Sequence, residues 1–365
     1  MNNFIFTSES VCAGHPDKIC DSISDAILDE ILKQDPTGRV AVETMVAFNK
    51  IFIVGEVTTT AKVDYEKVAR KRIRDLGYTN PLFNFTDQSP ITLDIHEQSP
   101  GIAKGVKVKG AGDQGMMFGF ACRETKTLMP MPITIAHRLV QKVDEVREKA
   151  ILPYLRPDGK SQITIEYKNG LPYKILQVVI AVPHEEKIEL AEVKKGLYKN
   201  VVTEVLDEFG FKVNQKDLVV NGTGVWHMPG PATDSGLTGR KIIVDTYGGY
   251  ARVGGGCFSG KDPTKVDRSG AYAARYLAKH VIKEKLADKA EVRLAYFIGA
   301  KKPVMLEIET FGTEKMPVKV IKNFMSEILD TSVAGIIEEL DLQKPIYLAT
   351  SAYGHFGRPE FSWEK

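Results

Sequence analysis

One pattern recurs three times along this chain of 365 residues and limits the folds that it can form. In each pass a helical run, with apolar residues at spacings of three and four, precedes two strand-like runs and a second helical run. Passes spaced by roughly 110–140 residues are typical of separate α+β units. The first pass is predicted to have a helix from Asp17 to the stop at Pro36, strands over 39–48 and 51–60 and a helix over 64–76. The second has a helix over 133–151, strands over 162–167 and 173–182 and a helix over 185–209. The third has a helix over 269–286, strands over 291–298 and 304–310 and a helix over 318–329.

This recurrence predicts an α+β fold of three pseudo-symmetric units that share a core. We place an N-terminal domain at 1–100, a central domain at 101–225 and a C-terminal domain at 226–365, with approximate boundaries and interleaved units. Glycine- and proline-rich interruptions fall at corresponding places in the three passes. Because loops on a rigid scaffold often carry binding and catalytic groups, these interruptions are the candidate working parts.

Composition excludes several classes of protein. The formal net charge is only +2, from 49 Lys and Arg against 47 Asp and Glu residues, so no overall field favours nucleic acid as a partner. The four cysteines lack CxxC spacing, which argues against a zinc site or a disulfide framework and for reduced thiols. The N-terminus has no signal-peptide pattern, and no later run is apolar enough to span a membrane. We therefore expect a soluble, cytoplasmic protein with no nucleic-acid or membrane partner.

The most glycine-rich stretch is 248–269, and we call its residues 254–268 the cradle. Four glycines there lack the Cβ atom that would keep a polyanion away from backbone N–H groups. The cradle also has three cations that can neutralise phosphate and two aspartates that can hold a hard cation such as Mg²⁺. These residues are Gly254, Gly255, Gly256 and Gly260, then Lys261, Lys265 and Arg268, then Asp262 and Asp267. We interpret the cradle as a polyphosphate site.

A nucleotide-binding P-loop is the alternative for this stretch. Residues 255–261 match the GxxxxGK pattern, but Asp262 stands where a P-loop needs Ser or Thr to hold Mg²⁺. The context also fails, because the strand predicted at 242–247 ends well before the glycines. We therefore reject the P-loop.

Other loops carry candidate groups, each with a plain structural alternative. His15 and Asp17 begin the first helix, where they can cap it or contact a phosphate. Three glycines surround Asp113 at 110–115, and a simple turn explains them as well as a site does. The lysine-bearing segment 101–109 is a candidate lid, with a solvated charged loop as the alternative.

Charged residues also lie beside the predicted strands. Arg240 and Lys241 precede the strand at 242–247, and together with the cradle cations they give a local excess of positive charge. Glu43 and Glu56 fall in the first hairpin. A strand carboxylate usually lies on a solvated face, and nothing nearby in the sequence singles these two out.

Five motifs together resemble the S-adenosylmethionine synthetase (methionine adenosyltransferase) family, and they extend over essentially the whole chain. They occupy residues 14–18, 110–115, 236–249, 254–262 and 352–358. The resemblance implies synthesis of S-adenosylmethionine from ATP and L-methionine, by in-line attack of the methionine sulfur on ribose C5′, followed by hydrolysis of the bound triphosphate to diphosphate and phosphate. It also implies three pseudo-symmetric α+β domains, two Mg²⁺ ions and one K⁺ ion per site, and a homodimer with shared active sites, or a homotetramer.

The residues agree with that chemistry. A thioether is already nucleophilic and has no proton to lose, so the transfer needs no general base or activated serine. It needs a positioned sulfur atom and cations that stabilise a triphosphate leaving group. An ATP-dependent kinase would need a proton-abstracting base, and the sequence offers none. A non-catalytic nucleotide-binding relative would have lost charged loop residues, whereas every one that we can match is present.

The resemblance assigns roles residue by residue. His15 would stabilise the bridging oxygen as the C5′–O bond breaks, Asp17 and Asp267 would hold Mg²⁺, and Glu43 would hold K⁺. The catalytic residues would be His15, Asp113, Lys160, Arg240, Lys241, Lys261 and Lys265. ATP would contact His15, Asp158, Lys160, Val225, Trp226, Asp234, Arg240, Lys241, Cys257 and Lys261. L-Methionine would contact Glu56, Gln98, Asp234 and Lys265.

Two positions depart from the family's pattern. Bacterial relatives often have Arg-Phe where this chain has Val225 and Trp226, so an aromatic face for adenine is kept and a cation is lost. Cys257 replaces the usual alanine of the cradle. Nearby lysines could lower the pKa of its thiol, or it could be a small inert side chain.

Overall fold

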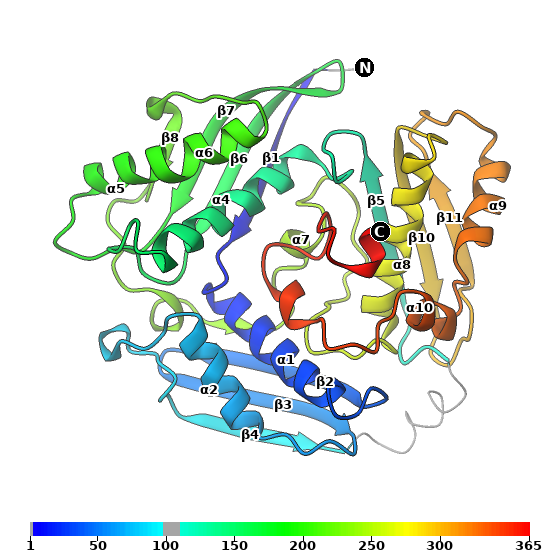
Figure 1. Ribbon diagram of the computed structural model, residues 1–365, viewed down its shortest axis with the longest axis horizontal. Helices are drawn as coiled ribbons and strands as arrows, with labels where there is room; N and C mark the ends of the chain where they lie inside the picture. Colours follow the sequence, from blue (N-terminus) through cyan, green and yellow to red (C-terminus); the bar gives the residue numbers. More distant parts are fainter. Residues whose placement is uncertain (1–2, 98–109) are drawn as a thin grey trace.

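The computed structural model describes residues 3–97 and 110–365, which form three β-sheets with helices packed on them (Figure 1). The strand orders of the sheets are β4-β3-β2-β9, β1-β6-β7-β8 and β11-β10-β5. Each sheet contains one of the three predicted antiparallel pairs, namely β2 with β3, β6 with β7 and β10 with β11. The prediction of an α+β fold with three units is confirmed.

The first sheet lies under two helices. Its elements are β2 (Arg39–Ala47), β3 (Lys50–Thr58), β4 (Ile91–His96) and β9 (Gly236–Leu237), with α1 (Pro16–Leu32) and α2 (Tyr65–Asp75) over one face (Figure 1). Alternate residues of β2, such as Val40 and Val42, are buried on the α1 side. Because side chains alternate between the faces of a strand, Glu43 points to the opposite, open face.

The second sheet is completed by the first strand of the chain. Its elements are β1 (Phe4–Val11), β6 (Lys160–Lys168), β7 (Leu171–Ala181) and β8 (Leu218–Val220), with α4 (Met131–Glu148), α5 (Leu190–Leu197) and α6 (Thr203–Glu208). Asn169 and Gly170 have φ of 53° and 77°, as the type I′ hairpin turn requires. The helix predicted over 185–209 begins only at Leu190 and contains a π-helical turn at Tyr198–Val202.

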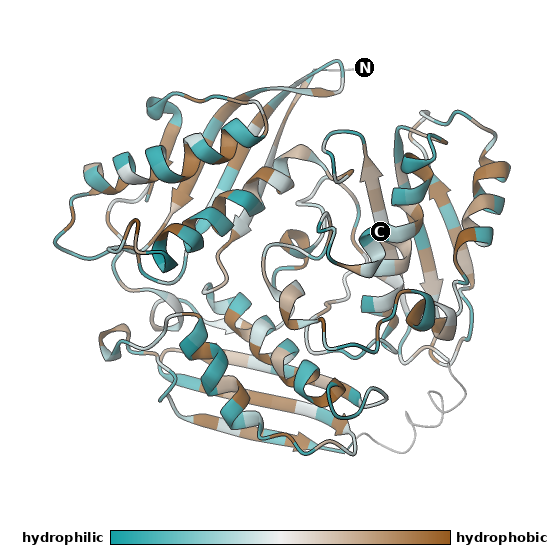
Figure 2. Cartoon of the chain, viewed as in Figure 1, coloured by the Kyte–Doolittle hydropathy of each residue, from teal (hydrophilic) through white to brown (hydrophobic). Residues whose placement is uncertain are grey.

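The third sheet has three strands with helices on one side. Its elements are β5 (Gly115–Cys122), β10 (Lys289–Tyr296) and β11 (Met305–Glu309), with α8 (Val266–Lys283), α9 (Val318–Ile328) and α10 (Val333–Glu339). Short 3₁₀ helices lie at Pro81–Phe83, Gln215–Asp217, Gly230–Ala232, Leu348–Ser351 and Ser362–Glu364. Figure 2 shows apolar residues along the strands, and they form two cores: one joins the first and third units and the other fills the second.

The chain crosses between the sheets. β1 precedes α1 in sequence, but it pairs with β6 at the edge of the second sheet. β5 pairs with the distant strand β10, so that Gly115 lies opposite Tyr296. β9 follows β2 by almost 190 residues in sequence and extends the edge of β2 in the first sheet. Each sheet therefore contains strands that are far apart in sequence.

The strand predicted over 242–247 is wrong. Residues Ile242–Asp245 form one helical turn, α7, in which the Asp245 amide donates to the Lys241 carbonyl at 2.8 Å. The β-branched run favours a strand, but this turn buries the Asp245 carboxylate against the buried Lys18 ammonium. Leaving one partner of a buried ion pair without its counter-ion costs about 3–5 kcal/mol, which exceeds a strand propensity of about 1 kcal/mol.

Candidate active site

One face of α1 carries a row of four aspartates, Asp17, Asp21, Asp25 and Asp29, which we call the aspartate row. A spacing of four places them above one another along the helix. All four side chains are buried. Their carboxylates accept backbone N–H groups from residues more than 200 positions further along the chain, at 2.8–3.0 Å: in the same order Leu237, Gly239, Gly260, and the pair Tyr347 and Leu348. The row thus fixes the loops that carry the candidate cations onto α1.

The last member of the row has a testable pH signature. Burial raises the pKa of Asp29 from 3.8 to about 6. Between these values the folded protein binds more protons than the unfolded chain, so the stabilisation from this carboxyl falls as the pH rises from about 4 to 6. Asp29→Asn does not titrate, so its melting temperature relative to the parent should rise over this pH range in calorimetry. Parallel curves for the two proteins would contradict the assignment.

His15 is the N-cap residue of α1, and its side chain is almost completely buried. Burial, and then the charges of Lys241 and Lys160, lower its pKa to about 3, so the ring is neutral near pH 7. Its Nδ1 accepts the Asp17 amide at 3.2 Å, which places the proton on Nε2. Nε2 has no hydrogen-bond partner within the described residues. The side chain therefore presents one buried N–H donor that needs an acceptor.

Cations surround the start of α1. The Asp17 carboxylate pairs with the Lys241 ammonium, and Arg240 Nε lies 3.7 Å from its Oδ1. Burial opposes ionisation of Asp17, but the hydrogen bonds from Lys241 and the Leu237 amide outweigh it and lower its pKa. We call His15, Asp17, Lys160, Arg240 and Lys241 the helix-start group.

Asp158 lies beside this group, on the loop that precedes β6. Its carboxylate accepts the amides of Gly159 at 2.7 Å and Gly230 at 2.9 Å. Burial raises its pKa to about 7. Its backbone φ of 127° lies in the region that favours glycine, a strain typical of functional sites.

The cradle forms a second cluster. Lys261 Nζ donates to Asp267 Oδ2 at 2.7 Å, and Glu43 and Lys261 lie near enough to Cys257 to affect the pKa of its thiol. Burial, reinforced by Asp21 and Glu56, raises the pKa of Glu43 to about 7, although Lys261 opposes the shift. We call Glu43, Cys257, Lys261 and Asp267 the cradle group.

The glycines and the cysteine of the cradle have clear structural roles. A Cβ atom on Gly256 would lie 2.4 Å from the Asp267 carboxyl carbon, and one on Gly260 would lie 2.0 Å from the Val42 carbonyl oxygen. Burial raises the pKa of the Cys257 thiol even though Lys261 lowers it. The structure thus favours the interpretation that Cys257 is a small inert side chain rather than a reactive thiol.

The prediction that Arg268 is available to bind phosphate is wrong. The sequence places it among the cations open to phosphate, but its guanidinium is 0% exposed and makes two bonds to Asp25, at 2.7 and 2.9 Å. It also donates to the carbonyls of Phe258, at 3.0 Å, and Lys261, at 3.2 Å. The Asp25–Arg268 pair therefore holds the cradle backbone from behind and is closed to a ligand.

The remaining candidates lie around these clusters. Lys265 pairs with Asp262, and the Gly112 amide donates to the neighbouring Thr264 carbonyl at 3.2 Å, which brings the loop of Asp113 to the cradle. Asp113 itself is exposed, with Oδ1 accepting the Gln114 amide. Gln98 and the candidate lid at 101–109 lie outside the described residues.

The candidate contacts for methionine and the nucleoside are more open. Glu56 Oε1 lies 3.5 Å from His96 Nε2, on the sheet face that also carries Glu43. Asp234 and Val225 are exposed. Trp226 is half-buried, and its indole N–H donates to the Met228 carbonyl at 2.6 Å, so its ring face rather than its N–H is available for stacking.

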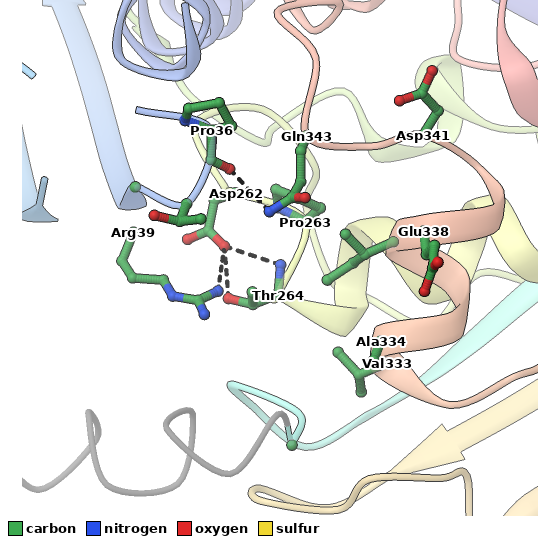
Figure 3. A pocket seen from close by; sticks show the side chains of 14 residues that line it. Pro36, Arg39, Asp262, Pro263, Thr264, Val333, Ala334, Glu338, Asp341 and Gln343 are labelled. Atoms are coloured by element: carbon green, nitrogen blue, oxygen red, sulfur yellow. Dashed lines mark hydrogen bonds and ion pairs between the residues drawn. The ribbon is translucent and has the colours of Figure 1, made fainter. Parts of the chain in front are cut away.

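A pocket of about 560 Å³ lies between the 36–39 turn, residues 262–264 of the cradle and α10 (Figure 3). Arg39 Nη1 lies 3.5 Å from Asp262 Oδ1 at its wall, and the Thr264 hydroxyl donates to the same carboxylate at 2.6 Å. Of the residues that line this pocket, none belongs to the helix-start group or the cradle group.

Fold and site together define a class: a three-unit α+β protein whose glycine-rich loops bring lysine, arginine and aspartate side chains to one end of a helix and to one open sheet face. Models of the N-terminal, central and C-terminal domains of S-adenosylmethionine synthetase match residues 3–100, 108–226 and 228–365. The chain therefore belongs to the S-adenosylmethionine synthetase family, and the predicted enzyme class, a methionine adenosyltransferase, is confirmed.

Similar curated proteins support this assignment. The chain is 49% identical to an S-adenosylmethionine synthase of Brachyspira hyodysenteriae, with 100% of this chain and 96% of that protein covered. It is 49% identical to one of Treponema denticola (99% and 95% covered) and 48% identical to one of Clostridium tetani (99% and 96% covered). Among the described residues, no helix combines the length and apolar character needed to cross a membrane.

Proposed function

We propose that this enzyme joins ATP and L-methionine by in-line attack of the methionine sulfur on ribose C5′, and then hydrolyses the bound triphosphate to diphosphate and phosphate. The observation that carries the proposal is His15: a neutral, buried imidazole with an unpartnered Nε2–H at the N-terminus of α1, beside Lys241 and Lys160. Such a donor can stabilise the oxygen that leaves C5′ without taking part in proton removal.

The other residues supply charge and orientation. Lys160, Arg240 and Lys241 at the helix start, and Lys261 and Lys265 at the cradle, offset the negative charge of the triphosphate. Asp158, Val225, Trp226 and Asp234 bind the nucleoside, and Glu56, Gln98, Asp234 and Lys265 bind methionine. Asp113 completes the catalytic set, and Cys257 contributes only packing beside ATP.

We also propose two Mg²⁺ ions, held by Asp17 and Asp267, and one K⁺ ion, held by Glu43. In the described part of the chain, no three His, Cys, Asp or Glu side chains converge as a closed metal cage. This donor set fits Mg²⁺, because that ion usually binds one or two carboxylates together with substrate phosphates. When bound, the ions would neutralise charge on the polyphosphate.

A homodimer with shared active sites, alone or paired as a tetramer, is part of the proposal. Among the described residues, no hydrogen bond or ion pair joins the helix-start group to the cradle group, which supports the proposal that one chain supplies parts of two active sites. The open face of the first sheet carries Glu43 next to apolar side chains that are 40–43% exposed: Met45, Val54 and Leu237. Covering this face with a second copy would bring further groups to Glu43.

Val54→Asp is expected to weaken the dimer at least tenfold, because it buries an unpaired charge at the proposed interface. Sedimentation velocity over a range of concentrations measures the change. Val320→Asp is the matched control, since Val320 is 42% exposed but lies on α9. Equal dissociation constants for the two variants would place the interface elsewhere.

The identity of the reaction products tests the proposed function. Incubation with ATP, L-methionine, Mg²⁺ and K⁺ should give S-adenosylmethionine, diphosphate and phosphate in equal amounts, with little product when either cation is omitted. ADP as the product would show a kinase, and no turnover would show a non-catalytic relative.

We also propose a cytoplasmic location, which the four free cysteines support.

A further inference from the structure

We propose that Tyr78 is a positioning residue for adenosyl transfer, because its hydroxyl group ties together the two loops that carry His15 and Asp158. The inference rests on the proposed function. Tyr78 is outside the five motifs, follows α2 and is completely buried in the first core, with its ring edge-on to Phe83 and Phe85. Its hydroxyl group makes hydrogen bonds to backbone carbonyls, not to the side chains of His15 or Asp158.

The hydroxyl group of Tyr78 contacts two carbonyl oxygens from different units of the fold. It lies 2.6 Å from the Gly14 oxygen and 2.9 Å from the Pro157 oxygen. Burial raises the pKa of Tyr78 far above neutral pH, so the phenol keeps its one proton and shares it between these acceptors. Without the hydroxyl group, both buried carbonyls would lose this donor.

The first carbonyl controls His15. Gly14 C=O belongs to the peptide group that joins Gly14 to His15, so its orientation sets where the His15 Cα–Cβ bond points. The Gly14 Cα is also packed closely: a Cβ atom there would lie 3.3 Å from the Tyr78 ring and 3.2 Å from the Asp158 amide. A donor on this carbonyl therefore limits the directions that the His15 Nε2–H can take.

The second carbonyl controls Asp158. Pro157 C=O belongs to the peptide group that precedes Asp158, and rotating this group changes the strained φ of 127°. A strained residue of this kind costs about 1–3 kcal/mol and persists only when its surroundings hold it. The Tyr78 hydroxyl is one such restraint, and the Gly230 amide, which donates to Asp158, is another.

The loop of Gly230 meets the same hydroxyl group. A Cβ atom on Gly230 would lie 2.3 Å from the Tyr78 oxygen, so the loop that leads to Asp234 also rests on this side chain. Three loops with proposed substrate contacts thus converge on one phenol. By contrast, the buried Tyr296 hydroxyl donates to the single Thr331 carbonyl at 2.7 Å, away from these loops. Tyr296 is therefore a matched control.

The experiment compares Tyr78→Phe with Tyr296→Phe, each alone and combined with His15→Ala. Both phenylalanine variants keep the ring and should fold, with similar small losses in melting temperature. Tyr78→Phe should lower kcat about 10- to 100-fold, in line with the effect of small misplacements on reacting groups, and change KM for methionine less than threefold. Tyr296→Phe should keep kcat within twofold.

The double variants test whether the hydroxyl acts through His15. In the His15→Ala background, Tyr78→Phe should lower kcat less than threefold further, because the catalytic residue that it positions is gone and Asp158, the other residue that it restrains, is a proposed nucleoside contact rather than a catalytic residue. A full 10- to 100-fold loss in that background would overturn the proposal. A kcat within twofold of the parent for Tyr78→Phe alone would also overturn it.

A spectroscopic readout separates this proposal from the proposed function. With labelled histidine, the His15 ring signal, assigned by its loss in His15→Ala, should shift or broaden in Tyr78→Phe and stay unchanged in Tyr296→Phe. If the parent makes no S-adenosylmethionine, the proposed function fails, and the His15 signal still decides the positioning role. An unchanged signal in Tyr78→Phe would overturn that role.

Discussion

Replacing Lys261 with alanine is expected to lower adenosyl transfer and triphosphate hydrolysis together, each by about 10²- to 10³-fold. Burial disfavours the charged form of Lys261, but its neighbours, among them the Asp267 carboxylate, outweigh burial and raise the pKa, so the ammonium is charged near pH 7. Without this cation, the carboxylates of Asp267 and Glu43 would face a polyanion with less compensation. Quenched-flow measurements of both products give the two rates.

The control for this variant is Lys322→Ala. Lys322 also pairs with a carboxylate, Glu307, at 2.6 Å, but on the exposed face of α9. We expect both rates to stay within twofold of the parent. If Lys261→Ala slowed transfer while triphosphate hydrolysis kept its full rate, one cation would not serve both steps and our description of the cradle would be wrong.

Asp25→Asn is expected to destabilise the fold by about 3–5 kcal/mol. It removes the charge opposite Arg268, whose guanidinium has no access to water and would remain buried without a counter-ion. The asparagine oxygen can still accept the Gly260 amide, so most of the loss comes from the unpaired charge. Urea denaturation followed by circular dichroism measures the free energy of unfolding.

Two comparisons isolate that charge. Combining Asp25→Asn with Arg268→Gln should cost less than the sum of the single changes, because no lone ion stays buried. Asp75→Asn breaks the exposed Lys71–Asp75 pair of 2.6 Å and should cost about 1 kcal/mol or less. A loss for Asp25→Asn as small as that surface value would show that the pair does not support the cradle.

The three units are visible in the sequence because each helix and hairpin has its own periodicity and its own stop signals, such as the Asn169–Gly170 turn. The strand exchange is not visible, since β1 and β5 are short strands whose partners lie far along the chain. The turn at 242–245 has the composition of a strand, and its helical form depends on Lys18. Local patterns therefore predict elements better than they predict pairings.

The candidate site shows the same division. Its charged residues are predicted from motifs, because glycines and cations are close in sequence in each loop. The spacing of the aspartate row is visible in the sequence, but its burial depends on amides more than two hundred residues away. Tyr78 has no local signal, because a hydroxyl that bridges two carbonyls is defined only by the folded positions of Gly14 and Pro157. Positioning residues of this kind can be identified only once the folded structure is known.

The exchange of strands between sheets also has a consequence for synthesis on the ribosome. The nascent chain releases β1 first, yet its partner β6 emerges only after roughly 150 further residues, which takes on the order of ten seconds. β5 waits in the same way for β10, and β2 lacks one edge partner until β9 has left the exit tunnel. Unpaired strand edges are templates for association with other chains. Newly made copies therefore pass through a period in which these strand edges are unpaired, and no single unit can complete its own sheet.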